Sequence, residues 1–254
     1  MNSSITCLRA AALQARHGFL GRSGGLSSGL FESLNVGLGS TDDGQAVAGN
    51  RARATALVAP GAALVTLYQV HGAEVVEAGA WPESERPRAD ALVTDRPGLA
   101  LGILTADCAP VLFEDAGAGV IGAAHAGWRG AFAGVLAATV AAMERLGARR
   151  ERITAAVGPC IGRKSYEVDE AFRRRFETAD AENAAFFGVG RAGHGLFGLE
   201  GYCLARLAQA GIRRAEGLGA DTMADPGRFF SYRRSTLAGD PDYGRQLSLI
   251  ALPD

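Results

Sequence analysis

Cysteine and histidine are scarce in this sequence of 254 residues, which contains four of each. The cysteines lie far apart and form no Cys-x-x-Cys pair. We therefore expect neither a disulfide framework nor a structural zinc site built on paired cysteines.

Lysine, net charge and long apolar runs are also lacking. Lys164 is the only lysine among 26 lysine and arginine residues, and the formal net charge is −1. A chain without excess positive charge has no electrostatic basis for binding nucleic acid. No stretch approaches the roughly 20 apolar residues of a membrane span, and Met1–Gln14 lacks the early basic cluster of a secretory signal. We expect a cytoplasmic protein with no nucleic-acid or membrane partner.

The rest of the composition is that of an ordinary globular protein, with 48% hydrophobic and 21% charged residues. Apolar periodicity predicts strands over Ala63–Gln69, Glu74–Ala78, Leu99–Thr105, Val111–Glu114, Val120–Ala124, Ile153–Val157 and Gln246–Leu252. It predicts helices over Gln45–Leu57, Phe132–Leu146, Asp169–Glu177 and Leu199–Ala210. The elements do not alternate regularly and no linker divides the chain, so we predict an α+β fold with mixed β-sheets in one domain, residues 1–254.

Three residues are candidates for chemistry: His71, Cys108 and His125. Each lies at the end of an apolar, strand-like run, beside small residues that leave room for a ligand. Imidazole and thiolate suit zinc, and three protein ligands with an open fourth position are typical of a catalytic site that activates water. The spacing alone does not distinguish metal ligands from packed core residues, so both interpretations stay open.

Other residues allow two interpretations each. Arg129 lies just before a predicted helix and is either an anion-binding residue or a surface arginine. Asp107 is either a carboxylate that orients a metal ligand or a turn residue. Cys160 fits a small loop residue better than a fourth ligand, and Arg233 with Arg234 fits a pair of surface side chains.

Nine short segments, spread over nearly the whole chain, form a specific combination. They are His17-Gly-Phe, Gly24-Gly-Leu-Ser, Ser33-Leu-Asn35, Asn50-Arg51, Gln69-Val-His-Gly72, Asp90-Ala-Leu-Val-Thr94, Thr105-Ala-Asp-Cys-Ala-Pro110, Ala124-His-Ala-Gly-Trp-Arg-Gly130 and Arg228-Phe-Phe-Ser-Tyr-Arg-Arg234. Together they resemble the YfiH or laccase-domain family, whose members are described as multicopper polyphenol oxidases and as purine nucleoside phosphorylases. The implied fold is a layered α/β/α-type sandwich with mixed β-sheets, similar to a group of bacterial toxin cysteine hydrolases.

The resemblance implies a zinc-dependent enzyme that acts on purine nucleosides. The zinc ligands of the family fall on His71, Cys108 and His125, where copper is also possible, and the same three residues are the predicted catalytic groups. The implied reaction is phosphorolysis of adenosine, inosine and methylthioadenosine, with adenosine deamination as a second activity. The implied partners are a nucleoside and phosphate, and the chain would be a monomer or a small homo-oligomer. The predicted substrate contacts are Asn35, Arg51, Gln69 and Arg129.

Two segments depart from the family pattern. Gly162-Arg163-Lys164 stands where the family often has Gly-Pro, and Asp221-Thr222 stands where many members have Cys-Thr. Neither contains a proposed metal ligand, so the departures concern loop contacts. The usual nucleobase deaminase signature, His-x-Glu with Pro-Cys-x-x-Cys, is also missing, so deamination would require a different acid–base group.

Three other functions remain as alternatives. A multicopper oxidase needs more imidazoles than four histidines supply, although a single copper ion at the triad stays possible. A metal-free hydrolase would use Cys108 as nucleophile and His71 or His125 as its base, on an amide such as a peptidoglycan precursor. The third alternative is a non-catalytic binding protein stabilised by zinc.

Overall fold

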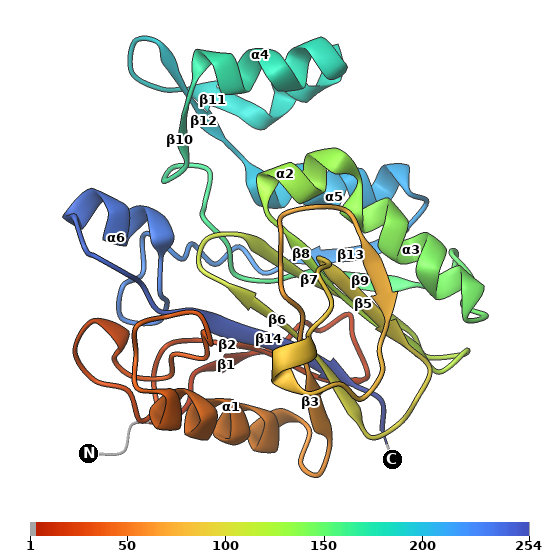
Figure 1. The fold of residues 1–254 in the computed structure, drawn as a ribbon. Coiled ribbons are helices and arrows are strands. Elements are labelled where there is room, and N and C mark those ends of the chain that lie inside the picture. The colour runs from red at the N-terminus through yellow and green to blue at the C-terminus, as the bar shows by residue number, and fades with distance from the viewer. Residues whose placement is uncertain (1–3, 254) are drawn as a thin grey trace.

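The computed structural model describes residues 4–253 and is drawn in Figure 1. Its helices are α1 (Gly44–Val58), α2 (Trp128–Ala133), α3 (Val135–Arg145), α4 (Glu170–Ala179), α5 (Leu199–Gln209) and α6 (Tyr232–Ala238), with 3-10 turns η1 (Gly29–Phe31), η2 (Glu83–Glu85) and η3 (Ala181–Phe186). Its strands are β1 (Cys7–Leu8), β2 (Arg16–Leu20), β3 (Ala63–Val65), β4 (Val75–Glu77), β5 (Ala91–Thr94), β6 (Leu99–Thr105), β7 (Ala109–Asp115), β8 (Val120–Ala126), β9 (Thr154–Val157), β10 (Glu167–Asp169), β11 (Phe187–Val189), β12 (His194–Phe197), β13 (Arg214–Gly217) and β14 (Gln246–Ala251). The sequence predicts that Met1–Gln14 is not a secretory signal, and the first three residues of that segment lie outside the described residues.

Two mixed β-sheets form the centre of the molecule. One has five strands in the order β1-β2-β14-β6-β3, and the other has six in the order β13-β9-β7-β8-β5-β4. β3 pairs with β6 in parallel and β4 with β5 in parallel, whereas β14 pairs antiparallel with both β2 and β6. The predicted α+β class with mixed sheets is confirmed.

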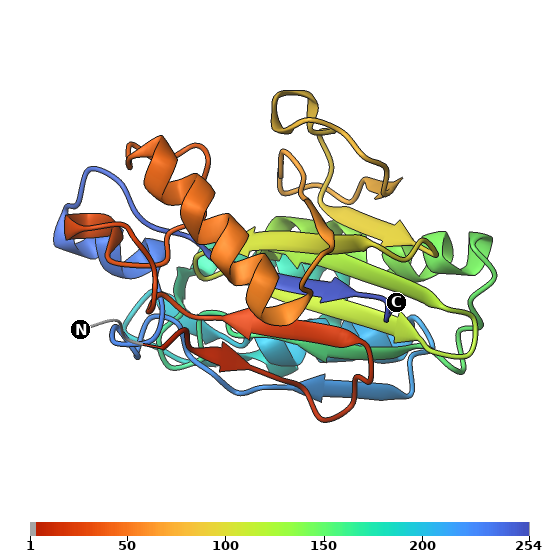
Figure 2. The same cartoon turned by 90° about the horizontal axis from the view of Figure 1, so that it is seen from below.

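The two sheets pack face to face, and helices cover their outer faces. Helix α1 lies across the five-stranded sheet, while α2, α3 and α5 lie on the six-stranded sheet (Figures 1 and 2). The layers therefore follow the order α/β/β/α. This differs from the α/β/α arrangement that the resemblance implied, because two sheets rather than one lie between the helices.

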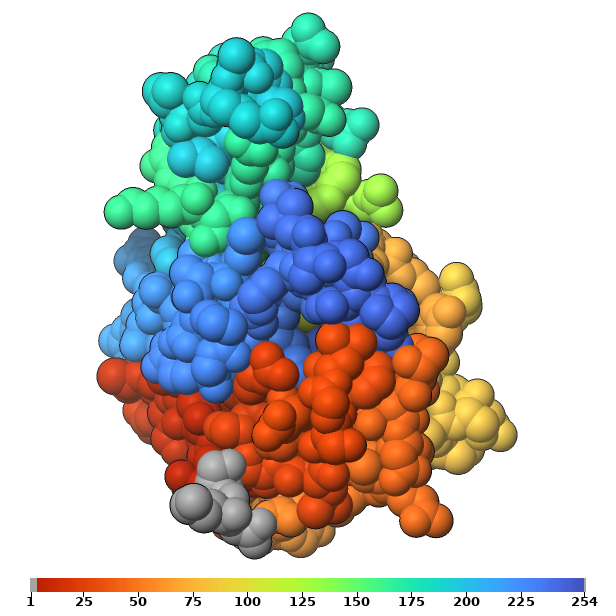
Figure 3. Space-filling view, turned by 90° about the vertical axis from the view of Figure 1, so that its left-hand side faces the viewer, coloured from red at the N-terminus to blue at the C-terminus, as the bar shows by residue number. Residues whose placement is uncertain are grey.

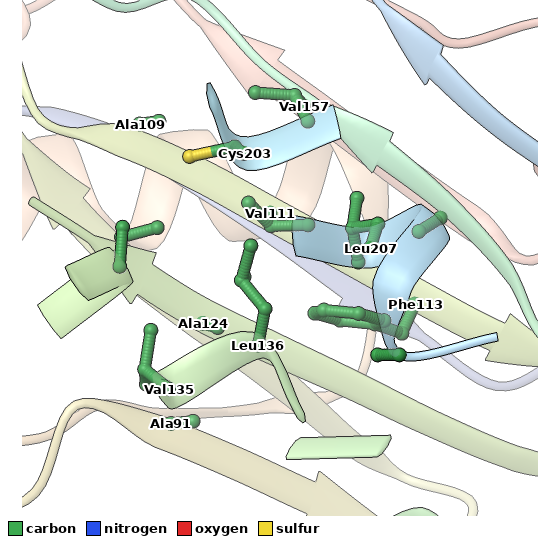
Figure 4. Close-up of a cluster of buried hydrophobic side chains, with 14 of the residues drawn as sticks. Ala91, Ala109, Val111, Phe113, Ala124, Val135, Leu136, Val157, Cys203 and Leu207 are labelled. Carbon is green, nitrogen blue, oxygen red and sulfur yellow. The ribbon is translucent and has the colours of Figure 1, made fainter. Parts of the chain in front are cut away.

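The central strands are buried on both faces. In β7, Leu112 packs between the two sheets, whereas Val111 and Phe113 face the helices beside Leu136 and Leu207 (Figure 4). A strand covered on both sides is apolar at nearly every position, which is why the pattern predicted β6 and the middle of β7 correctly. Such strands are rigid supports for the residues at their ends.

A smaller lobe, residues 167–197, stands above the main body and is here called the aromatic lobe. Its sheet has the order β10-β12-β11, with α4 alongside (Figure 1). Phe172 and Phe176 stack 4.9 Å apart, and Trp128 of α2 contacts Phe172 at 4.9 Å between ring centroids. Figure 3 shows the lobe directly above the C-terminal segment, which in turn lies on the N-terminal part of the chain. The aromatic contacts attach the lobe to the main body.

Most predicted helices agree with the structure, but one segment that was predicted as a single helix forms two. Asp43 caps α1 by accepting hydrogen bonds from the backbone N–H groups of Gln45 and Ala46, as its position before the helix predicts. The predicted helix Phe132–Leu146 is instead broken by Gly134, whose φ of 95° is left-handed and ends α2 before α3 begins.

The strand predicted over Ala63–Gln69 is also too long, since β3 ends at Val65. Helix α6 and the sheet of the aromatic lobe were not predicted. Within residues 4–253, none of the helices combines the length and the apolar character that crossing a bilayer requires. A single domain over residues 1–254 stays a prediction.

Candidate active site

His125 is held by a buried carboxylate at the end of two paired strands. It lies one residue before the end of β8 and is 3% exposed. Its Nδ1 atom is 2.8 Å from Oδ1 of Asp90, which immediately precedes β5, the strand paired with β8. Because Nδ1 is engaged, Nε2 is the ring nitrogen left to face Cys108, with which the imidazole also interacts.

The same carboxylate positions His71 through the backbone. The N–H groups of Val70, His71 and Gly72 donate to Asp90 at 3.1, 2.9 and 2.7 Å. His71 has a φ of 61°, a left-handed conformation that few residues with a side chain adopt. Burial raises the pKa of Asp90, but the hydrogen bonds from His125 and from these N–H groups lower it by more than burial raises it. The pKa therefore lies below its usual value and the carboxylate stays ionised. Asp90 therefore fixes both histidines.

Cys108 lies in the turn between β6 and β7, and the adjacent Asp107 secures that turn. Asp107 has a φ of 81°. Its carboxylate accepts hydrogen bonds from Thr222 Oγ1 at 2.6 Å, from Ser231 Oγ at 2.9 Å and from the backbone N–H of Arg233 at 2.6 Å. Of the two interpretations of Asp107, the structure supports the turn residue, which ties the Cys108 turn to the C-terminal part of the chain.

His71, Cys108 and His125 converge as the sequence pattern predicted. One ligand atom from each lies within 4.8 Å of the other two, and Cys108 Sγ is 3.9 Å from His71 Nε2. A tetrahedral ion with bonds of about 2.0–2.3 Å needs its ligand atoms about 3.5 Å apart, so a small contraction would close the site around a metal. Two imidazoles and a thiol, with a carboxylate fixing one imidazole, fit zinc.

The electrostatics of the triad favour a thiolate. Burial raises the pKa of Cys108, but its interactions with His125 and His71 outweigh burial and lower the pKa to about 6. Burial lowers the pKa of His125, but Cys108 and Asp90 raise it to about 9. At neutral pH the sulfur is therefore negatively charged, which is the form that binds a metal or attacks as a nucleophile.

The triad lies on the wall of a pocket of about 750 Å³. This volume falls in the range of small-molecule sites. The aromatic side chains that line the pocket are Tyr68, Trp128, Tyr166, Tyr232 and Tyr243. The arginines that line it are Arg86, Arg129, Arg233 and Arg245. Among the described residues, the negative groups that line the pocket with them are the carboxylate of Asp107 and the thiolate of Cys108. The four guanidinium groups outnumber these two, so the pocket attracts anions although the chain as a whole is nearly neutral.

Two of the four predicted substrate contacts line this pocket. Arg129 is exposed and lies with its guanidinium 5.2 Å from the centre of the Trp128 ring. It is the second residue of α2, not a residue before a helix as the pattern suggested. The Gln69 amide is already engaged, because Nε2 donates to the carbonyl of Leu104 and Oε1 accepts from its N–H. Gln69 therefore shapes the wall.

The other two predicted contacts, Asn35 and Arg51, do not line the pocket. Asn35 is fully buried, and its Oδ1 accepts from the N–H groups of Gly37 and Arg245. Arg51 is 5% exposed, and it donates to the carbonyl of Val36 and to Thr66 Oγ1. Both side chains support the loops behind the pocket wall, and their contact with a substrate stays a prediction.

Arg233 and Arg234 do not form the surface pair that the sequence suggested, whereas Cys160 is the small loop residue that it predicted. Arg233 lines the pocket and donates to the carbonyl of Glu167, whereas Arg234 turns inward to the carbonyls of Thr222 and Met223, so neither is part of a surface pair. Cys160 is 2% exposed and lies outside the triad, with its pKa raised by burial, as expected of a loop residue.

The sequence pattern missed three residues that build the site: Asp90, Tyr166 and Arg245. Asp90 had a signal, because it is an ionisable residue directly before the apolar run that forms β5. Tyr166 and Arg245 had no such signal in the sequence, since they enter the pocket from segments about 80 residues apart in the chain.

Comparison with known proteins agrees with this fold and site. Residues 16–253 match the family model described as "Multi-copper polyphenol oxidoreductase laccase". A purine nucleoside phosphorylase of Pseudomonas aeruginosa is 41% identical over the full length of both chains, and one of Deinococcus radiodurans is 43% identical over 98% of this chain and 94% of its own.

Solved structures show the same relationship. A Neisseria meningitidis protein of family DUF152 superposes with a TM-score of 0.87 at 34% identity and covers 99% of this chain and 100% of its own. The YlmD protein of Geobacillus stearothermophilus superposes with a TM-score of 0.84 at 30% identity, covering 94% of this chain and 92% of its own. The chain is thus a member of the YfiH-like, or laccase-domain, family.

Proposed function

We propose that the chain is an enzyme, a purine nucleoside phosphorylase that acts on adenosine and inosine in the pocket beside His71, Cys108 and His125. The observation that carries the proposal is the pocket itself, in which a histidine–cysteine–histidine triad, aromatic side chains and arginines meet. Relatives more than 40% identical over nearly the whole chain bear the name of this activity.

The lining residues suit the two substrates of phosphorolysis. Aromatic rings such as Tyr68 and Tyr243 provide flat apolar surfaces for a purine base. Guanidinium groups such as that of Arg129 bind phosphate through charge-assisted hydrogen bonds. Both substrates must be held together for reaction, and a volume of about 750 Å³ accommodates a nucleoside with phosphate.

The triad would hold a zinc ion, and copper would fit the same three ligands. When bound, zinc supplies a Lewis acid that polarises a substrate atom. Asp90 keeps His125 oriented with Nε2 toward Cys108, and the thiolate of Cys108 supplies the negative charge that such a cation requires. We do not propose polyphenol oxidation, because within residues 4–253 this triad is the only group of three metal-binding side chains and the chain has four histidines in all.

Adenosine deamination and phosphorolysis of methylthioadenosine are further activities that we propose for the same pocket. Deamination adds water at C6 of adenine and releases ammonia, so it requires a group that accepts and returns a proton. His71, the exposed member of the triad, and His125 are the imidazoles available in the pocket. The expected partners are small molecules, and a cytoplasmic location and a monomer or small homo-oligomer remain predictions.

A second candidate function is an amidase that uses Cys108 as nucleophile. The observation in its favour is the charge state of the triad, a thiol with a pKa of about 6 beside an imidazole with a pKa of about 9. That arrangement is typical of an activated cysteine with its histidine. The substrate would be an amide such as a peptidoglycan precursor.

A turnover assay separates the two candidates. Inosine and adenosine are incubated with the purified protein, with and without phosphate, and the released base and ribose 1-phosphate are measured. Phosphorolysis predicts base release that depends on phosphate and is lost in His125→Ala and Cys108→Ala, while Cys160→Ala, a buried cysteine outside the triad, keeps the activity. Base release that is independent of phosphate, or zinc-free protein with a Cys108 that reacts with amide substrates, would contradict the proposal.

A further inference from the structure

The four arginines of the pocket differ in how free they are to bind a ligand. Arg86 donates from Nε to the carbonyl of Glu83 and from its terminal nitrogen to the carbonyl of Leu67, so it braces two loops. Arg245 stacks on Tyr243, at 4.2 Å from the ring centre, and donates from one terminal nitrogen to the carbonyl of the same residue, so its side chain is folded back onto Tyr243. These two side chains are largely committed to holding the wall.

Arg129 and Arg233 have more N–H groups available to bind a ligand. The Arg129 guanidinium stacks on Trp128 and donates no hydrogen bond to another of the described residues, so all its N–H groups are available. Arg233 uses one terminal nitrogen for the carbonyl of Glu167 and has its other N–H groups available. Both line the pocket, from α2 and α6 respectively.

Tyr166 lines the same pocket as these two arginines and Cys108. The Arg233 guanidinium is 5.2 Å from the centre of its ring. Burial and the negative charges of Cys108 and Asp107 raise the pKa of Tyr166, while the positive charges of Arg233 and Arg129 lower it. Its hydroxyl is therefore within electrostatic range of both arginines and of Cys108.

We propose that Arg129, Arg233 and the Tyr166 hydroxyl form the phosphate subsite of this pocket, on the side of Cys108. The inference rests on the proposed phosphorolysis and says where its second substrate binds. Two guanidinium groups and a hydroxyl offer donors in several directions, as a tetrahedral phosphate requires. The oxygens of the nearby Asp107 accept hydrogen bonds from Thr222, Ser231 and the backbone N–H of Arg233, so these donors offset part of its negative charge.

Phosphate held at this subsite acts as the nucleophile. One of its oxygens forms a bond to C1′ of the ribose while the bond from C1′ to N9 of the purine breaks. The electron pair of the broken bond goes to N9, which takes up the proton that the attacking hydrogenphosphate gives up, and the products are ribose 1-phosphate and the free base. The arginines do not provide that proton, since a guanidinium stays protonated, and they act by binding and orienting phosphate.

The test compares Arg129→Gln and Arg233→Gln with a matched control, Arg175→Gln. Arg175 stacks on the same Trp128 ring as Arg129, also at 5.2 Å, but does not line the pocket. Each subsite variant loses hydrogen bonds to a charged ligand, so the KM for phosphate should rise about 10-fold to 100-fold while the KM for inosine changes about twofold or less. Arg175→Gln should keep both KM values, and Arg233→Lys, which keeps the charge, should lie between Arg233→Gln and the wild type.

Calorimetric titration of each protein with inorganic phosphate keeps this test separate from that of the proposed function. Phosphate binding that weakens in Arg129→Gln and Arg233→Gln supports the subsite even if no nucleoside is turned over. An unchanged KM for phosphate in both variants of an active phosphorylase overturns the subsite and leaves the function standing. Wild-type protein that neither binds phosphate nor turns over nucleosides overturns both.

Discussion

Replacing Asp90 by asparagine is the sharpest single test of how the triad is held. In the structure each carboxylate oxygen accepts two hydrogen bonds. Oδ1 accepts from the ring of His125 and the N–H of His71, and Oδ2 accepts from the N–H groups of Val70 and Gly72. Asparagine retains one oxygen and turns an NH₂ group toward two donors, so two of the four hydrogen bonds are lost together with the charge.

The size of the effect follows from these contacts. A hydrogen bond to a charged group contributes about 1.5–3 kcal/mol, and local relaxation recovers part of the loss of two, so we expect the free energy of unfolding to fall by about 3–4 kcal/mol. Loss of a carboxylate that orients a metal-binding histidine typically weakens metal binding 10-fold to 100-fold. Asp90→Asn should therefore lower zinc affinity by about that factor.

Zinc affinity is measured by competition with a chromophoric chelator, and stability by urea unfolding of the metal-free protein. The matched control is Asp115→Asn, since Asp115 is also fully buried and accepts several hydrogen bonds, but lies at the opposite end of β7 from Cys108. It should lose stability and keep zinc affinity. If Asp90→Asn binds zinc within about twofold of the wild type, Asp90 does not position the ligands and the reasoning is refuted.

Three further predictions concern pH, packing and a buried arginine. Burial raises the pKa of Asp115, but the Arg152 guanidinium and backbone N–H groups lower it below its usual range. Ionised Asp115 therefore stabilises the folded state above about pH 4, and this stabilisation is lost as the pH falls through the pKa of the folded protein. Urea unfolding from pH 5 to 2.5 should show this acid slope reduced in Asp115→Asn. In Gly127→Ala the new Cβ would lie 2.9 Å from Cys108 Sγ, so zinc affinity should fall by about tenfold or more. Arg51→Met should cost about 2–3 kcal/mol of unfolding free energy and leave the KM for phosphate within about twofold, because Arg51 supports loops behind the pocket.

Each of these has a result that would count against it. An acid slope identical in Asp115→Asn and the wild type would mean that this carboxylate does not govern acid stability. Gly44→Ala, at the start of α1 where an added Cβ meets open space, is the control for Gly127→Ala and should behave as the wild type. A tenfold rise in the KM for phosphate in a stable Arg51→Met protein would mean that Arg51 takes part in substrate binding, as the sequence predicts, and does not only support loops.

Local patterns predicted the elements whose causes are local. The Asp43 cap and the apolar run of Leu99–Thr105 are complete in the sequence, and α1 and β6 appear where they indicate. The break at Gly134 was missed because glycine is tolerated within a helix, and the left-handed φ that ends α2 depends on how α2 and α3 pack on the sheet. The pairing of β14 with β6 was not predicted for a related reason, since it joins segments about 140 residues apart in the chain.

The sequence by itself determined the class of fold and the family, because these depend on residue types, on apolar periodicity and on short sequence motifs. It also identified the three residues of the triad as candidates, through the resemblance to that family. Only the tertiary structure decided which carboxylate binds and orients the histidines of the triad. Asp107 is next to Cys108 in the chain but faces Thr222 and Ser231, whereas Asp90 reaches His125 because β5 pairs with β8. It likewise placed Arg51 behind the pocket and brought Arg233 into it. The physical reason is that adjacency along a chain says little about the direction of a side chain, while strand pairing and buried hydrogen bonds determine it.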